Sequence, residues 1–331
     1  MPAVSVIIPV YGVEAYIEKC ARSLFEQTLE DIEYIFVNDC TKDKSIEILQ
    51  QVIEDYPNRK HQTKIIHHET NRGLPQARKT GIENSTGKYI THCDSDDWVE
   101  NDMYSLMYEK AENENLDVIV CDVLKNDLDC TNVIKYFSKT PDNKDYLIKN
   151  LFSNTCLHNV GEILARHELY YQNFLYPTAN IFEDLVFASQ LLILAQKIGY
   201  LQKPLYHYVI HLTSMTNIYT EEQKIKQLIQ TKKNLDVCLM FMNQNNMDDK
   251  YIQLIKFFHN LNFKTAIRTK KKREQSAQYN YPSLKKGIIF NRDISLFLKI
   301  RYIILSMNWY WLHDYLTNLT RKNPILKNLF S

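Results

Sequence analysis

The chain is poor in the features that define several large classes of protein. It has seven Gly among 331 residues, no Gly-rich phosphate-binding loop, no CxxC pair and no unbroken apolar run of 18 residues. Its seven Cys are scattered and odd in number, which indicates reduced thiols rather than a disulfide framework. No clear membrane span is expected. Because no apolar signal segment precedes Ala3, we expect a cytoplasmic protein.

Positive charge is concentrated near the end of the chain. The formal net charge is +1, yet residues 254–331 hold 15 Lys or Arg and three acids, a net of +12. Such a segment indicates contact with an anionic partner, for example a membrane surface or a nucleic acid. A solvated helical face explains the composition equally well. No recognisable nucleic-acid-binding module accompanies the basic residues, so we expect no nucleic-acid partner.

The segment 294–316 mixes aliphatic and aromatic residues with basic ones. Its WYW cluster at 309–311 suits the headgroup zone of a membrane. Together with KKKR at 270–273, it suggests peripheral attachment at the inner face of the membrane. The alternative is a helical appendage packed on the rest of the protein.

Strand and helix patterns alternate over the first hundred residues. Short apolar runs typical of buried strands lie at 4–11, 33–39, 63–69 and 88–94. Segments with apolar residues at helical spacing lie between them, at 14–27, 44–56 and 74–86. This alternation predicts βαβ units and a mainly parallel sheet flanked by helices.

The pattern becomes less regular beyond residue 100. A helix is followed by the strand LDVIVCDV and then by an irregular segment that runs to about residue 180. A strongly apolar helix is predicted over 182–199, an extended segment over 200–214, and helices from 221 onward.

Polar residues follow the predicted strands at the points where they end. Ligands of parallel sheets bind beyond the carboxyl ends of the strands. Tyr11 and Glu14 follow the first strand, Asp39 ends the second, and Asp94 and Asp96 follow the fourth. We therefore expect these side chains to gather along one edge of the sheet.

Three carboxylates crowd the stretch THCDSDDWVE, at Asp94, Asp96 and Asp97. Like charges this close repel one another unless a cation or a network of donors neutralises them. A polar turn that caps the next helix is the alternative explanation.

Four ordered motifs carry a family resemblance. The stretches VSVIIPVYGVEAYIEKCARSLFEQTLEDIEYIFVNDCTKDKS and NRGLPQARKTGIENSTGKYITHCDSDDW resemble the opening domain of family 2 glycosyltransferases with the GT-A fold. IFEDLVF and KPLYHYVIHLTSMT resemble later motifs of that family. The resemblance implies a nucleotide-sugar-binding half at 1–100, an acceptor-binding half at 101–220 and a helical basic region at 221–331.

The resemblance also assigns a nucleotide site. Asp39 would recognise the uracil of a UDP-sugar, although capping the helix at 44–56 is an alternative role. Arg78 would contact the nucleotide or brace the Asp cluster. The residues that the resemblance places around the nucleotide are Pro9, Tyr11, Glu14, Asp39, Arg78, Asp94 and Ser95.

Transfer from a nucleotide-sugar expels a nucleoside diphosphate, whose charge a hard divalent cation would neutralise. We expect Mg²⁺ or Mn²⁺, with Asp96 as the direct ligand and Asp94 beside it. His211 is a further candidate for the metal or the diphosphate. Asp97 is expected to cap the following helix or to orient its neighbours.

Inverting transfer needs a base that takes the proton of the acceptor hydroxyl. Asp184 in FEDLVF matches the base position of the family, and the adjacent Glu183 would push its pKa upward. Without the resemblance, both acids would be explained by favourable interaction with a helix dipole.

The sequence departs from the family in a few places. Gly12 stands where Asn is usual, Cys40 where Gly is common, and His92 with Cys93 replaces a more apolar pair. The segment HNVGEILARHEL fits only loosely the pattern that normally carries a Lys near residue 160. None of these departures removes a catalytic group, and the last leaves the acceptor undefined.

The sequence therefore predicts a metal-assisted inverting glycosyltransferase that moves a sugar from a UDP-sugar to a glycan or lipid-linked glycan. One alternative is a catalytically silent protein that binds nucleotide-sugars or acts as a scaffold. The other is a metal-dependent nucleotidyltransferase, which the lack of a Gly-rich phosphate loop disfavours.

Overall fold

A computed structural model describes residues 1–126, 131–134, 144–152, 159–211, 220–266, 281, 294 and 296–306. The chain divides into two compact units, Met1–Asn217 and Ile218–Ser331. Each unit is described by itself. The five Cys among the described residues are free thiols.

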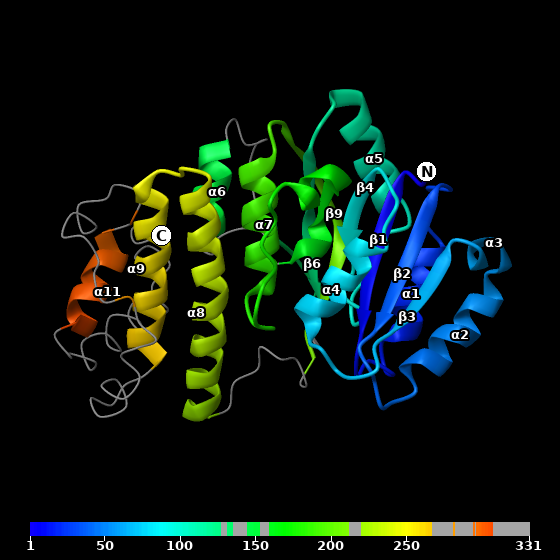
Figure 1. Ribbon diagram of the computed structural model, residues 1–331, viewed down its shortest axis with the longest axis horizontal. Helices are drawn as coiled ribbons and strands as arrows, with labels where there is room; N and C mark the ends of the chain where they lie inside the picture. The colour runs from blue at the N-terminus through cyan, green and yellow to red at the C-terminus, as the bar shows by residue number, and fades with distance from the viewer. Residues whose placement is uncertain are drawn as a thin grey trace. The chain divides into compact units, whose positions relative to one another are not determined.

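The first unit is built on a nine-stranded sheet with the order β3-β2-β1-β4-β8-β6-β9-β5, and β7 pairs with β6. Figure 1 shows β1, β2 and β3 side by side at one end of this sheet. Pairing is parallel between β1 and β2, β1 and β4, and β2 and β3, which confirms the predicted βα alternation. β8 is antiparallel to both β4 and β6. The strands are β1 (Val4–Val10), β2 (Ile32–Asn38), β3 (Thr63–His67), β4 (Tyr89–His92), β5 (Trp98–Val99), β6 (Val118–Asn126), β7 (Thr131–Ile134), β8 (Ile163–Arg166) and β9 (Ile198–Val209).

Helices flank this sheet. The helices of the first unit are α1 (Ile17–Phe25), α2 (Ser45–Asp55), α3 (Pro57–Lys60), α4 (Leu74–Glu83), α5 (Met103–Glu114), α6 (Lys144–Phe152) and α7 (Glu183–Leu194), with 3₁₀ turns η1 (Val160–Glu162) and η2 (His167–Tyr171). α4 lies close against β1, because a Cβ on Gly81 would come within 2.3 Å of Ile7. Ala77 of the same helix packs with Ile35 and Val37 of β2.

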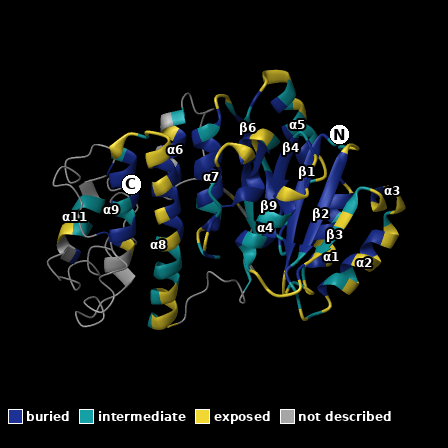
Figure 2. Ribbon diagram, viewed as in Figure 1, coloured by how far each residue is buried: buried dark blue, intermediate teal, exposed yellow. Residues whose placement is uncertain are grey.

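β1 is the buried centre of the parallel half of the sheet (Figure 2). All seven of its residues are buried, as its β-branched run predicts for a strand covered on both faces. Pro9 is in register with Val37 of β2, but the carbonyl that faces β2 is that of Val10, and Pro9 faces the side of β4. β4 pairs with β1 only as far as Ile7. The missing N–H of Pro9 therefore costs no ladder hydrogen bond.

α7 is shorter than predicted. It ends at Leu194 rather than residue 199, and β9 already begins at Ile198. Ala195 turns extended, with ψ 136°. The ammonium group of Lys144 in α6 donates hydrogen bonds to the carbonyls of Ile193 and Ala195. Carbonyls at the end of a helix have no partner within the helix, and Lys144 supplies one here. A contact from another helix therefore stabilises this end of α7.

The second unit contains α8 (Glu221–Gln244), α9 (Asp249–Ala266) and α11 (Leu296–Ser306). α8 begins with a capping box between Thr220 and Gln223. Among the described residues, no helix has both the length and the apolar character needed to span a membrane.

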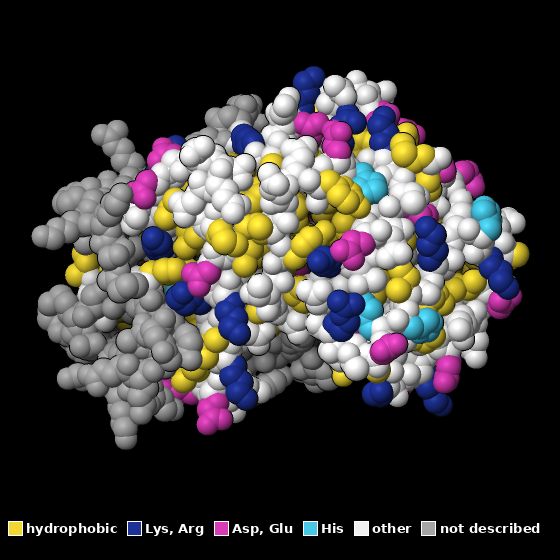
Figure 3. Space-filling model, viewed as in Figure 1, with side chains coloured by type: hydrophobic (Ala, Val, Ile, Leu, Met, Phe, Trp, Pro, Cys, Tyr) yellow, Lys and Arg dark blue, Asp and Glu magenta, His cyan; other side chains and the backbone are white. Residues whose placement is uncertain are grey.

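The hypothesis of membrane contact stays a prediction. The runs 270–273 and 309–311, on which it depends, lie outside the described residues. On the face drawn in Figure 3, the coloured surface mixes Lys and Arg with Asp and Glu side chains.

Candidate functional site

The carboxyl ends of three parallel strands bring predicted site residues to one edge of the sheet. The N–H of Asp39, after β2, donates to the carbonyl of Val10 at 3.0 Å. The hydroxyl of Ser95, after β4, donates to the carbonyl of Pro9 at 2.6 Å. Because β1 lies between β2 and β4, Asp39 and the Asp cluster flank the end of β1.

Asp39 is buried and holds the loop before α4. Its Oδ1 accepts hydrogen bonds from the N–H of Arg72 and from Nδ1 of His68, both at 2.8 Å. Its Oδ2 accepts the N–H of Gly73 at 2.8 Å. Gly73 has φ 86° and immediately precedes α4. Asp39 therefore fixes the start of the helix that carries Arg78.

A different acid supports the start of α2. The carboxylate of Asp43 accepts the N–H of Ser45 at 3.2 Å and its hydroxyl at 2.6 Å. Glu14 joins this turn, since its carboxylate accepts the N–H of Lys44 at 3.0 Å. Tyr11, at the end of β1, is 53% exposed.

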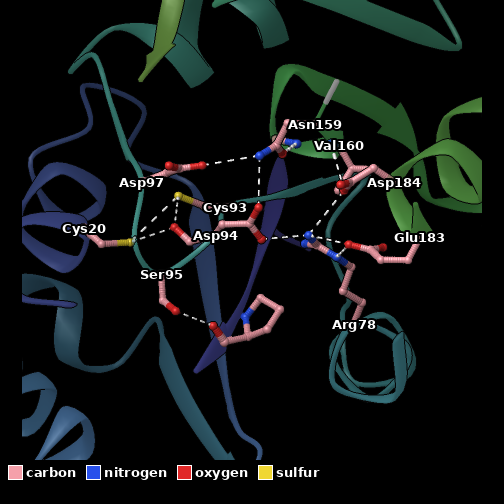
Figure 4. Close-up of polar contacts among 12 residues, drawn as sticks. Cys20, Arg78, Cys93, Asp94, Ser95, Asp97, Asn159, Val160, Glu183 and Asp184 are labelled. Atoms are coloured by element: carbon pink, nitrogen blue, oxygen red, sulfur yellow. Dashed lines mark hydrogen bonds and ion pairs between the residues drawn. The ribbon is translucent and has the colours of Figure 1, made fainter. Parts of the chain in front are cut away.

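Arg78 is the centre of the site (Figure 4). Its side chain is fully buried, and its Nη2 lies 2.7 Å from Asp94 Oδ1 and 3.4 Å from Asp184 Oδ1. Its Nε donates to Glu183 Oε1 at 2.9 Å. One guanidinium thus joins the acid cluster after β4 to the first turn of α7. Three carboxyl groups therefore share one guanidinium.

Asn159 bridges two members of the Asp cluster. Its Nδ2 donates to Asp94 Oδ2 at 3.0 Å and to Asp97 Oδ2 at 3.3 Å. Arg78 donates a hydrogen bond to Oδ1 of Asp94, so both oxygens of Asp94 have protein partners. Asn159 itself is fixed by a capping box with Glu162 at the start of η1.

Asp97 is tied to β9. It accepts the hydroxyl of Tyr206 at 2.6 Å and the N–H of Val209 at 2.8 Å. The next helix, α5, begins only at Met103, so Asp97 does not cap it. Burial, followed by the charges of Asp96 and Asp94, raises the pKa of Asp97 well above its ordinary value.

Asp96 pairs with His211. Oδ2 of Asp96 lies 2.7 Å from Nε2 of His211, and the imidazole stacks on Tyr16 at 4.7 Å between ring centroids. Within the described ranges, no group of three or more His, Cys, Asp and Glu side chains is arranged to hold a metal ion. A carboxylate beside an imidazole still fits a cation that takes its other ligands from phosphate oxygens.

Asp184 and Glu183 differ in exposure. The side chain of Asp184 is 28% exposed, whereas that of Glu183 is 1% exposed. Burial raises the pKa of Asp184 to about 6, against the opposing charge of Arg78. Burial raises the pKa of Glu183 well above its ordinary value. Only Asp184 is open to a substrate.

Two of the residues that depart from the family pattern, His92 and Cys93, are buried. His92 packs against Phe187 and lies 3.3 Å from the hydroxyl of Tyr170. Burial, and then the charge of Arg78, lowers the pKa of His92 well below its ordinary value. Cys93 lies 3.8 Å from the sulfur of Cys20. Both departures fill the core as neutral side chains.

The structure groups the predicted residues into three clusters. Asp39 lies with the loop before α4, Asp96 lies with His211, and Arg78 joins Asp94, Glu183 and Asp184. Sequence reasoning missed Asn159 and Tyr206. The pattern N-x-x-E at 159–162 is a capping-box signal that was available for the first of these.

Comparison with other proteins places this arrangement in a family. A family model of glycosyl transferase family 2 matches residues 5–170. EpsH of Bacillus subtilis, named as a glycosyltransferase, is 31% identical over 259 residues, which are 76% of this chain and 72% of EpsH. EpsJ of the same organism is 36% identical over 227 residues, which are 66% of this chain and 64% of EpsJ.

The fold matches a solved structure. S. aureus TarS 1–349 matches with a TM-score of 0.70 at 18% identity, over 97% of this chain and 92% of that one. TarS 1–349 in complex with UDP-GlcNAc matches with a TM-score of 0.64 at 17% identity, over the same shares of the two chains. This likeness confirms the predicted GT-A fold.

Proposed function

Because the chain belongs to glycosyl transferase family 2 and is a glycosyltransferase, we propose that it transfers a sugar with inversion from a UDP-sugar to a hydroxyl of a glycan or lipid-linked glycan. One observation carries this proposal. Arg78 links Asp94, in the cluster expected beside the leaving diphosphate, to Asp184, the expected base. The carboxylate expected near the leaving diphosphate and the expected base would therefore contact the same buried guanidinium.

The uridine would bind at Asp39. A carboxylate can accept about four hydrogen bonds, two on each oxygen. Oδ1 of Asp39 already accepts two and Oδ2 accepts one. We assign the imino N–H of uracil to the remaining position on Oδ2. TarS bound to UDP-GlcNAc supports a uridine donor by its likeness in fold.

The other predicted nucleotide residues would act in two ways. Tyr11 is exposed at the end of β1 and would lie against the nucleoside, beside Pro9. Ser95 is 4% exposed and bonded to Pro9, and Glu14 is bonded to the turn before α2. Ser95 and Glu14 would shape the pocket by holding its loops.

Asp96 and His211 are the residues that would hold Mg²⁺ or Mn²⁺, and the ion would replace the 2.7 Å hydrogen bond that now joins Asp96 Oδ2 to His211 Nε2. When bound, the cation would supply positive charge to the leaving diphosphate. Asp94 was predicted as a second ligand. Its two oxygens already accept from Arg78 and Asn159, so we propose that Asp94 orders the cluster behind the ion.

Asp184 would take the proton of the acceptor hydroxyl. Among the described residues its Oδ1 lies within 3.4 Å of Arg78 Nη2 and of the N–H of Val160. We assign proton removal to this carboxylate, which is 28% exposed. Glu183 is buried and would position Arg78, and through it Asp184, without touching substrate.

Several wider predictions remain part of this proposal. Residues 1–100 would bind the donor, residues 101–220 the acceptor, and the basic region 221–331 an anionic membrane surface. The protein would then work in the cytoplasm, at the inner face of the membrane.

The test is release of UDP from UDP-GlcNAc, UDP-glucose and UDP-galactose in the presence of Mn²⁺. We expect wild type to release UDP from at least one donor, and Asp184→Asn to lose about 100-fold or more of that rate. Equal rates for the two proteins would contradict Asp184 as the base. Release from no donor would favour the silent nucleotide-sugar-binding alternative.

A further inference from the structure

Phe182 is a strained and exposed aromatic residue directly before the two acids of α7. Its φ of 62° and ψ of 28° lie in the left-handed region, which is unfavourable for a bulky side chain. Its side chain is 41% exposed. Strained residues that persist in a fold cluster at functional sites, so this backbone outlier is a reason to look for a function.

The surrounding structure holds the backbone of this segment in place. Glu183 is bound to the buried Arg78. Earlier in the chain, Gln190 of α7 holds Leu175, accepting its N–H at 2.7 Å and donating to its carbonyl at 2.6 Å. A Gly at 182 would adopt the same φ without strain. The backbone geometry therefore does not explain why an aromatic ring stands here.

Packing does not explain the ring either. The nearby rings of Phe174, Tyr176 and Phe187 pack against one another in the core. Within the part of the chain that is described, Phe182 joins no such ring pair, and it is among the exposed large apolar residues. Its side chain is 41% exposed, and two residues further along the chain the carboxylate of Asp184 is 28% exposed.

We propose that Phe182 is a platform on which a sugar ring of the acceptor stacks. The inference rests on the proposed function. In an inverting displacement the acceptor hydroxyl approaches opposite the leaving diphosphate, and the base must touch that hydroxyl. The acceptor therefore lies beside Asp184, only two residues from Phe182. The C–H face of a sugar is apolar and suits an aromatic surface, while its hydroxyls face Asp184 and water.

The test compares Phe182→Ala, Phe182→Gly and Phe182→Trp with wild type. The probes are the methyl β-glycosides of glucose, galactose and N-acetylglucosamine. Two signals are measured: the increase in UDP release that each glycoside causes with Mn²⁺ and a UDP-sugar, and saturation-transfer difference NMR of the glycoside. We expect the Ala and Gly variants to lose about fivefold to tenfold in both signals, as expected for one lost aromatic contact. The Trp variant should stay within about twofold of wild type.

Tyr171→Ala is the matched control, because Tyr171 is an exposed ring of the same unit, at 63% exposure. It should stay within about twofold of wild type.

Unchanged signals in Phe182→Ala would overturn the platform. Loss in the Ala variant with full retention in the Gly variant would also overturn it, since only backbone strain separates those two. Failure of wild type to bind any glycoside by NMR would do the same. Absence of UDP release from wild type would contradict the proposed function instead, and the NMR comparison would still decide the platform.

Discussion

Nη2 of Arg78 lies 2.7 Å from Oδ1 of Asp94, although one residue belongs to α4 and the other to the turn after β4. The start of α4 is in turn fixed by Asp39, through the N–H groups of Arg72 and Gly73. α4 therefore connects the expected uracil site to the carboxylates of the expected transfer site.

Removing Arg78 should strongly destabilise the fold. Arg78→Ala leaves buried carboxylates without their cation, and breaking a buried ion pair in this way costs about 3–5 kcal/mol of unfolding free energy. Arg78→Lys keeps the charge but loses the planar fork that reaches three acids, so it should cost less. Urea unfolding followed by circular dichroism measures both. An unchanged midpoint for Arg78→Ala would show that the cluster is not held by this residue.

Activity should depend on pH through Asp184. Its pKa is raised to about 6, and a base works only when deprotonated. We therefore expect kcat/KM to rise as pH increases through about 6 and to fall about tenfold per pH unit well below it. Initial rates between pH 4.5 and 8 test this. A rate that is already full at pH 5 would contradict the raised pKa.

Cys40 offers a test of backbone strain. It has φ 60°, at a position where the family commonly has Gly. Cys40→Gly and Cys40→Ala both remove the thiol, so their difference isolates the backbone. We expect the Gly variant to be more stable by about 1 kcal/mol, because a Cβ is unfavourable at this φ. Equal unfolding free energies in urea would argue against strain at this residue.

Asn159 should matter for catalysis although it carries no charge. Its amide separates the carboxylates of Asp94 and Asp97. Asn159→Ala removes one donor from each carboxylate, although Arg78 still donates to Asp94 and Tyr206 to Asp97. It should lower kcat/KM for UDP release by about tenfold. Asn159→Asp is nearly isosteric but adds a third negative charge, so it should be worse. If the Asp variant matched wild type, the amide would have no role in ordering the cluster.

Local patterns were sufficient to predict the parallel half of the fold. The run VSVIIPV is apolar and β-branched, and all of it is buried in β1. The position of Asp39 at a strand end was likewise enough to place it at the carboxyl edge. These inferences depend only on side-chain period and on the geometry of parallel strands.

The remaining features depend on contacts between distant segments. Asn159 reaches Asp94 and Asp97 because β8 pairs with β4 in the sheet. No local sequence pattern predicts that antiparallel pairing. The early end of α7 likewise depends on Lys144, which comes from another helix. Local propensity favoured a longer helix, and the tertiary contact overrode it.

Calorimetric titration of UDP, with and without Mn²⁺, tests the central claim most directly. The proteins compared are wild type, Asp96→Ala and Asp102→Ala, the last of which removes an exposed acid that follows Asp96 in the chain. We predict that Mn²⁺ strengthens UDP binding by about tenfold or more in wild type and Asp102→Ala, and has no effect in Asp96→Ala. Identical binding by all three proteins, with or without Mn²⁺, would contradict a metal-assisted site at Asp96, and no UDP binding at all would contradict the uridine donor.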